Sequence, residues 1–193
     1  AANQPVVLDV GAAANGEPES YSGSDALLAL KVTDVPIEVH AFEMAARAAQ
    51  AIRERFSSMR RSRRHPLTTG STLEVHEFGV GAEPGKLLAS PMNGTDKERT
   101  ITLTGGSGTS KSRHNAFMAE VTSLDAWTRG HPFDRPIFYV KVDTNGHESA
   151  VLKGMERLLA TPVAAPLFMS FEYSFGWSDV FVELTGRLSG RDA

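Results

Sequence analysis

The sequence predicts an α/β fold, in which a mostly parallel sheet carries helices on both faces. Apolar, β-prone segments alternate with helical segments about five times, which is typical of this class. Three of these predicted strands end at an acidic residue, namely Glu43, Asp143 and Glu172, and Asp9 lies near the end of a fourth. Right-handed crossovers bring the carboxyl ends of such strands to one edge, where open α/β sheets bind ligands. Like charges at that edge would repel one another unless a ligand, a metal or a cation shares them.

The first half of the chain contains three predicted strands and two predicted helices. Residues 5–11 form an apolar run that ends in a glycine turn, and residues 37–42 alternate between apolar and polar side chains. Residues 24–31 are predicted to form a helix with a polar N-cap, and residues 45–59 are rich in Ala and Arg, which favour helices. Residues 73–80 are predicted to form the third strand, closed by a Gly and Pro turn.

The second half continues the alternation. Residues 87–101 are expected to hold short antiparallel pieces around an Asn93-Gly94 turn. Residues 105–112 are rich in Gly and Ser and indicate a surface loop, because no buried strand precedes them as a phosphate-binding loop requires. The remaining predictions are strands at 138–142 and 167–171 and helices at 150–159 and 179–188. The length suits a single domain over residues 1–193.

Composition excludes several classes of function. A net charge of −3 disfavours a nucleic-acid-binding protein. The basic cluster formed by Arg60, Arg61, Arg63, Arg64 and His65 is interpreted as a solvated helix end, with binding of phosphate or of an acidic partner as the alternative. No apolar run approaches the ~20 residues of a membrane span. The absence of cysteine excludes disulfides and thiolate chemistry and fits a reducing compartment, so a cytoplasmic location is favoured.

The turn after the first strand decides between two nucleotide-type cofactors. A nicotinamide site needs the pattern G-x-G-x-x-G, but residues 11–16 read Gly-Ala-Ala-Ala-Asn-Gly and lack the middle glycine. S-adenosylmethionine has no pyrophosphate, so a looser bend suffices beneath its amino-acid part. An acid at the end of the second strand is also needed for its ribose hydroxyls. Asp9 to Ala12 supply the bend and Glu43 supplies the acid.

Four segments together resemble the FkbM-type methyltransferases, and the resemblance extends from Val6 to about Glu172. The segments are residues 7–12, 40–43, 122–125 and 140–154, the last containing the most distinctive pattern, Lys-x-Asp, Gly-x-Glu and Leu-x-Gly. The resemblance implies a Rossmann-like class I methyltransferase fold and O-methylation of a hydroxyl on a small molecule or sugar. It implies S-adenosylmethionine contacts from Asp9, Gly11, Ala12, Asn15, Glu43 and Asp143.

The chain departs from the family in two places. The family's first motif reads Asp-x-Gly-Ala-Asn-x-Gly, whereas Asn15 and Gly16 come two and one residues late here. The chain also ends soon after the last predicted strand, so the final antiparallel hairpin is expected to be missing, as in a fragment or a trimmed variant. These departures keep a non-catalytic binding or regulatory module open as the alternative function.

The segment after residue 142 contains the candidate catalytic groups. His147 is the first candidate for the base that deprotonates the acceptor, because imidazole titrates near neutrality, and a water-exposed helix start is its alternative. Asp143 is the second candidate. Glu148 is the third, although a carboxylate at the start of a helix is also explained by the helix dipole. Lys141 lies in a buried strand and needs an acidic partner, for which Asp9, Asp143 or Glu172 is available.

The acceptor side is predicted from the residues that follow the last strand. Lys141, Glu172 and Trp177 are the candidate substrate contacts, with core packing as the alternative for Trp177. Asp143 and Glu172 resemble the metal acids of catechol-type O-methyltransferases, and their oxygens would suit Mg²⁺. No third ligand is evident, and two acids can equally bind substrate hydroxyls. We therefore expect no metal at this edge.

Overall fold

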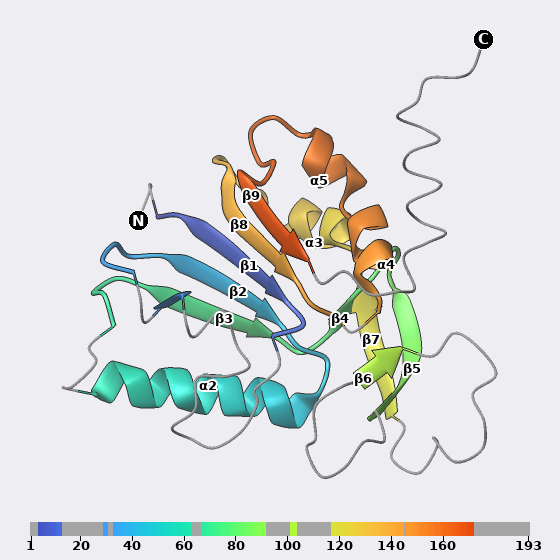
Figure 1. The fold of residues 1–193 in the computed structure, drawn as a ribbon, viewed down its shortest axis with the longest axis horizontal. Helices are drawn as coiled ribbons and strands as arrows, with labels where there is room; N and C mark the ends of the chain where they lie inside the picture. Colours follow the sequence, from blue (N-terminus) through green and yellow to red (C-terminus); the bar gives the residue numbers. More distant parts are fainter. Residues whose placement is uncertain are drawn as a thin grey trace.

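The structure, a computed structural model, describes residues 4–12, 29–30, 33–62, 67–91, 101–103, 117–144 and 146–171. These residues form two sheets (Figure 1). The first is a five-stranded parallel sheet of order β3-β2-β1-β8-β9, and the second has four strands in the order β4-β7-β5-β6. The predicted α/β class with a mostly parallel sheet is confirmed.

Three of the four predicted strand-end acids, Asp9, Glu43 and Asp143, lie in or directly after strands of the five-stranded sheet, and Glu172 lies outside the described residues. The strands of this sheet are β1 (Val6–Val10), β2 (Glu38–Phe42), β3 (Thr72–His76), β8 (Ile137–Val142) and β9 (Phe168–Phe171). From β1 the chain adds strands toward one side, through β2 and β3, and then returns to the other side with β8 and β9. The order therefore reverses between β1 and β8, which is the switch point where doubly wound sheets bind ligands.

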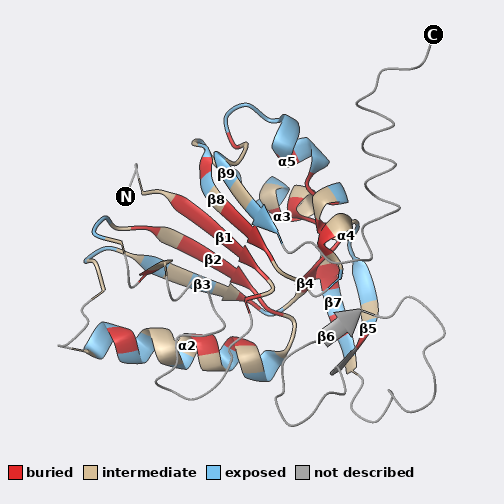
Figure 2. Ribbon diagram, in the orientation of Figure 1, coloured by how far each residue is buried: buried red, intermediate tan, exposed pale blue. Residues whose placement is uncertain are grey.

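Helices cover both faces of this sheet, as predicted. They are α2 (Ala46–Arg61), α3 (Leu124–Gly130), α4 (Glu148–Lys153) and α5 (Glu156–Ala160). Ile52 and Met59 of α2 pack in one core cluster with side chains of β1 and β2. Residues of α3, α4 and α5 pack on the other face, and within this sheet β1, β2 and β8 are the most buried strands (Figure 2). The exposed Arg60 and Arg61 lie in the last turn of α2, where the helix dipole favours cations.

The second sheet corrects the predicted strand over residues 73–80. That segment is two strands, because β3 ends at His76 and β4 (Gly79–Val80) pairs in the second sheet with β7 (Phe117–Thr122). A Cβ atom on Gly79 would lie 3.3 Å from Val121, so the glycine suits this close pairing. The expected antiparallel pairing is confirmed between β5 (Gly85–Pro91) and β6 (Ile101–Leu103), while Asn93-Gly94 lies outside the described residues.

The prediction of one continuous helix over residues 150–159 is wrong. The segment forms two helices, α4 and α5, with a break at Gly154. A Cβ atom on Gly154 would lie only 2.0 Å from the carbonyl oxygen of Gly81, so the chain touches the second sheet at this point. The carboxylate of Asp125 then accepts from the backbone N–H groups of Arg157 and Leu158 at 2.9 and 2.8 Å, which caps a new helix start.

Other predicted elements lie largely or wholly outside the described residues. Of the predicted helix 24–31, only Ala29 and Leu30 are described; both are helical, and Leu30 is buried against the α2 side of the sheet. The segment 105–112, the helix 179–188 and part of the basic cluster (residues 63–65) are not described. Among the described residues, no helix has both the length and the apolar character needed to cross a membrane.

Candidate functional site

Three acidic residues gather at the carboxyl edge of the parallel sheet. Asp9 lies in β1, Glu43 directly follows β2, and Asp143 directly follows β8, and these three strands are neighbours. Asp9 shares its face of the sheet with Val7, which packs against the α2 side. We call Asp9, Glu43, Lys141 and Asp143 the acidic edge. It lies beside the switch point of the sheet, as the strand-end acids predict.

Lys141 lies between two of these acids. Its Nζ is 3.4 Å from Oδ1 of Asp9 and 3.4 Å from Oδ2 of Asp143. Asp9 and Lys141 are buried and are register partners across β1 and β8, whereas the Asp143 side chain is 42% exposed. Two of the predicted acidic partners of Lys141, Asp9 and Asp143, thus lie within ion-pair distance of its ammonium group. The ammonium group of Lys141 compensates the repulsion between the two carboxylates. The acidic edge is accessible to solvent at Asp143.

Glu43 is buried and is held by the backbone around it. Its Oε1 accepts from the N–H of Ala45 at 2.8 Å, and its own N–H donates to the carbonyl of His76 at 3.0 Å. Burial raises the pKa of the Glu43 carboxyl, and the negative charge of Asp9 adds to this, while the Ala45 hydrogen bond opposes it. The carboxyl therefore takes up a proton more readily than an exposed glutamate, and it is suited to hydrogen bonding with hydroxyl groups.

Gly11 permits close contact between the ends of two strands. Its φ is +80°, and a Cβ atom there would lie 1.9 Å from the carbonyl oxygen of Asp143. The N–H groups of Gly11 and Ala12 both donate to the carbonyl of Phe42 at 3.1 Å. Packing of the three strand ends accounts for the glycine by itself. Cofactor contact at Gly11 and Ala12 stays a prediction.

Glu148 organises the loop between β8 and α4. It is fully buried, and its Oε1 accepts from the Thr144 N–H at 2.8 Å and from the Thr144 hydroxyl at 3.1 Å. The Gly146 N–H donates to both carboxylate oxygens, at 3.1 and 3.0 Å, with Gly146 at a φ of +102°. These hydrogen bonds support Glu148 as a residue that positions the loop. They do not test the prediction that Glu148 is catalytic.

His147 occupies the N-cap position of α4 between Gly146 and Glu148. Its carbonyl accepts from the N–H of Val151 at 3.0 Å, and the residue is partly exposed. Glu148 therefore fixes the backbone of His147 within the loop between β8 and α4, which also contains Asp143. Its role as a base stays a prediction. Asn15, Glu172 and Trp177, the remaining predicted site residues, lie outside the described residues.

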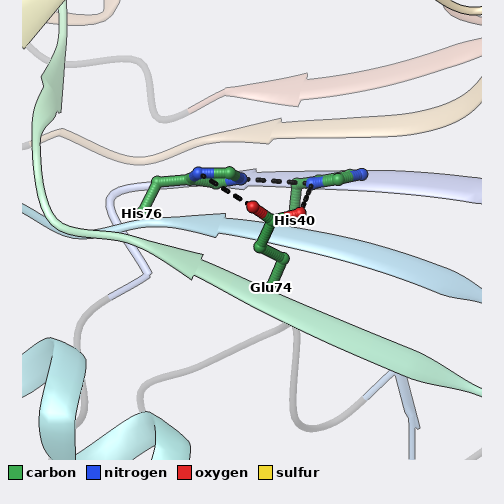
Figure 3. A group of neighbouring side chains, drawn as sticks. All are labelled: His40, Glu74 and His76. Atoms are coloured by element: carbon green, nitrogen blue, oxygen red, sulfur yellow. Dashed lines mark hydrogen bonds and ion pairs between the residues drawn. The ribbon is translucent and has the colours of Figure 1, made fainter. Parts of the chain in front are cut away.

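A second titratable group, which the sequence patterns did not single out, lies on the opposite face of the sheet. Nδ1 of His40 in β2 is 3.1 Å from Nε2 of His76 in β3 and 3.6 Å from Oε2 of Glu74. We call His40, Glu74 and His76 the histidine group (Figure 3). A short repeat in the sequence could have indicated this group. Residues 39–42 read Val-His-Ala-Phe, and residues 75–78, at the end of the next strand, read Val-His-Glu-Phe.

The histidine group has aromatic neighbours. The ring of Trp127 lies edge-on to His40 and His76, with centroids 5.0 and 5.2 Å apart, and Phe42 stacks on His76 at 4.8 Å. Burial lowers the pKa of His76 to about 4, and electrostatic interactions with His40, His131 and Arg53 act in the same direction. His76 is therefore neutral at physiological pH, with one ring nitrogen carrying a lone pair.

Ser123 and Asp125, two further residues within the FkbM-like segments, have structural contacts. The Ser123 hydroxyl accepts from the N–H of Ala126 at 3.1 Å and caps α3, and Asp125 caps α5 through the N–H groups of Arg157 and Leu158.

Searches of protein-family models, of curated protein sequences and of solved structures found no match to this chain. The geometry of the acidic edge and of the histidine group is therefore the basis on which a function is inferred.

Proposed function

We propose that this chain is a methyltransferase that uses S-adenosylmethionine to methylate a hydroxyl of a small molecule or sugar. The observation that carries the proposal is the grouping of Asp9, Glu43 and Asp143 at the carboxyl ends of three adjacent parallel strands, beside the switch point. This is the position at which open α/β sheets bind nucleotide-like ligands. The sequence resemblance to FkbM-type enzymes points to the same edge.

The charge of the acidic edge fits a cationic ligand. Two carboxylates, Asp9 and Asp143, flank one ammonium group, that of Lys141, so the edge keeps a net negative charge even when Glu43 is protonated. S-adenosylmethionine carries a positive sulfonium, an ammonium and a carboxylate, so its own net charge is positive. Glu43, which is buried and hydrogen-bonded to the start of α2, is the proposed partner of the ribose hydroxyls.

The chemistry places modest demands on the protein. The sulfonium supplies an activated methyl group, so alignment with the acceptor oxygen is the main requirement. The acceptor hydroxyl must also lose its proton, and His147 is the proposed base because its loop is fixed by Glu148. Lys141 and Asp143 are the proposed acceptor-side contacts, since the Asp143 side chain is partly exposed.

Calorimetric titration with S-adenosylmethionine and its demethylated product tests the donor. We expect a dissociation constant on the order of micromolar. The Glu43→Ala variant should bind at least about tenfold more weakly, a loss of roughly 1.4 kcal/mol. Glu54→Ala is the matched control, because Glu54 is an exposed glutamate of α2 that contacts Gln50. Folded wild-type protein that gives no heat with either ligand would contradict the proposal.

A non-catalytic binding module is the second candidate. It is favoured by the structural contacts of three residues within the FkbM-like segments, since Ser123 and Asp125 cap helices and Glu148 holds a loop. Transfer of a labelled methyl group to a panel of hydroxyl acceptors separates the two functions. Turnover that is lost in His147→Ala, with donor affinity unchanged, would support the enzyme. Weak or absent donor binding, with no turnover on any acceptor, would support the module.

A further inference from the structure

The histidine group lies on the face of the sheet opposite the acidic edge. In the register of β2 and β3, His40 is the partner of Glu74 and Phe42 is the partner of His76. Alternation along each strand therefore points the side chains of His40, Glu74 and His76 to one face, as Figure 3 shows. Neither imidazole has a role in the proposed methyl transfer.

The spacing of these side chains matches a metal-binding site. Each residue offers a ligand atom, and these atoms all lie within 4.8 Å of one another. The nitrogen–nitrogen distance from His40 to His76 is 3.1 Å, and the distance from His40 Nδ1 to Glu74 Oε2 is 3.6 Å. Two ligands of a tetrahedral zinc ion, each about 2.0–2.1 Å from the metal, are about 3.3 Å apart. The two His40 distances differ from this value by a few tenths of an ångström, whereas Nδ1 of His76 is 3.9 Å from Oε1 of Glu74. The exposed Glu74 side chain would therefore have to move for an ion to contact all three residues.

An outer carboxylate orients the first imidazole. Nε2 of His40 is 3.0 Å from Oε1 of Glu38, and the other oxygen of Glu38 is 2.6 Å from the guanidinium of Arg135. A carboxylate in this position accepts the Nε2 proton and leaves the lone pair on Nδ1, the nitrogen that faces His76 and Glu74. Carboxylate–histidine–metal arrangements of this kind fix ring orientation at zinc sites.

From this geometry we infer that His40, Glu74 and His76 bind a divalent transition-metal ion, with Zn²⁺ the best match. Imidazole and carboxylate suit zinc, whereas Mg²⁺ and Ca²⁺ prefer oxygen ligands throughout. Three protein ligands leave a fourth position for water or for a ligand atom. The ion can enter from solvent beside Glu74, whose side chain is 60% exposed, whereas both histidines are buried.

Metal titration tests the site without any methyl donor. Protein stripped with a chelator is titrated with Zn²⁺ by calorimetry, with Mg²⁺ and Ca²⁺ as comparison ions, and with Co²⁺ by visible absorption. We expect one Zn²⁺ per chain with a dissociation constant in the micromolar range or below. We also expect a Co²⁺ spectrum of a four- or five-coordinate nitrogen and oxygen site. Absence of Zn²⁺ binding to the folded chain would overturn the inference and leave a simple chain of hydrogen bonds from Arg135 to His76.

Three variants locate the ion. His76→Gln should abolish binding, and Glu74→Gln should weaken it by at least about tenfold. Glu74→Gln carries the test if His76→Gln fails to fold, because its side chain is mostly exposed. His131→Gln is the matched control: it is the neighbouring histidine, its ring centroid lies 6.2 Å from that of His76, and it contacts the Trp127 carbonyl. Unchanged binding in His76→Gln and Glu74→Gln, or equal loss in His131→Gln, would contradict the assignment.

The result is independent of the proposed function. Zinc binding reports on the face of the sheet that carries α3, and donor binding reports on the carboxyl edge beside Gly11. Loss of zinc binding in His76→Gln with unchanged affinity for the methyl donor would show two separate sites. The two proposals therefore succeed or fail on different measurements.

Discussion

The acidic edge and the histidine group each take one residue from β2 or its carboxyl end, and yet they have opposite properties. β2 contributes His40 to the face that carries α3, and Glu43 directly after it to the acidic edge. The acidic edge combines three carboxyl groups with one lysine and is open to solvent at Asp143. The two histidines of the histidine group are buried and contact aromatic rings, whereas the Glu74 side chain is mostly exposed. Alternation along a strand thus gives one short segment two chemical environments.

Burial acts on both regions in the same sense, since it favours the neutral form of each group. It raises the pKa of Glu43 and lowers that of His76 to about 4. The raised pKa suits Glu43 to its proposed role as a partner of hydroxyl groups, whereas a neutral imidazole is the form that can coordinate a metal ion. The two regions also share a backbone contact, because the N–H of Glu43 donates to the carbonyl of His76 at 3.0 Å.

The largest effect is expected where the acidic edge depends on a glycine. Gly11→Ala should lower the free energy of unfolding by on the order of 3–5 kcal/mol, because its Cβ would collide with backbone at a positive φ. Gly146→Ala is the control: its φ is also positive but its surroundings are open, so about 1–2 kcal/mol is expected. Urea unfolding measures both. Equal losses would show that the contact with Asp143 has no energetic weight.

The next effect concerns the loop that presents His147. Glu148→Gln should cost about 2–3 kcal/mol of unfolding free energy, because a neutral amide replaces a buried carboxylate that accepts from Thr144 and Gly146. Glu156→Gln, at an exposed glutamate in the first turn of α5, should change stability by less than about 0.5 kcal/mol. Thermal and urea unfolding are the measurements. A Glu148→Gln protein as stable as wild type would contradict the positioning role.

A smaller effect tests the outer support of the histidine group. Glu38→Gln should weaken Zn²⁺ binding by about tenfold, because the amide no longer draws the Nε2 proton of His40 as strongly. Glu120→Gln is the control, since its ion pair with Lys86 lies on the second sheet and is exposed. Zinc calorimetry decides between the outcomes. Equal affinity in the two variants would mean that Glu38 does not orient the ligand.

The smallest effect on stability is a gain. Burial raises the pKa of Glu43 above 4.5 in the folded state. The contribution of the protonated Glu43 carboxyl to the stability of the wild-type protein is therefore fully present below pH 4.5, and it is lost as the pH rises through the raised pKa. Glu43→Gln should therefore unfold at a higher urea concentration than wild type at pH 7, and the difference should vanish below pH 4.5. Glu54→Gln should show neither change.

The same Glu43→Gln variant should bind the demethylated cofactor more weakly. A gain in stability with a loss of ligand affinity is the behaviour expected of a binding residue. A gain in stability with unchanged affinity would remove Glu43 from the proposed donor site and leave it as a strained buried acid.

Several features of the fold were predictable because they depend on neighbours in the sequence. The apolar runs that became β1, β2, β8 and β9 are visible locally, as is the helical composition of α2. The ionic partner of Lys141 was predictable from burial alone, since a buried ammonium group needs an acid. The break at Gly154 was not, because it arises from contact with Gly81, more than seventy residues earlier in the chain.

The sequence by itself determined the alternation of strands and helices and the acids at the strand ends, which together require a parallel sheet with charged groups at one edge. Only the tertiary structure decided which side chains meet. The register of β2 with β3 brings His40 opposite Glu74 and within reach of His76, and the pairing of β1 with β8 brings Lys141 to Asp9. Periodicity is local, whereas register and strand order depend on contacts between residues far apart in the chain.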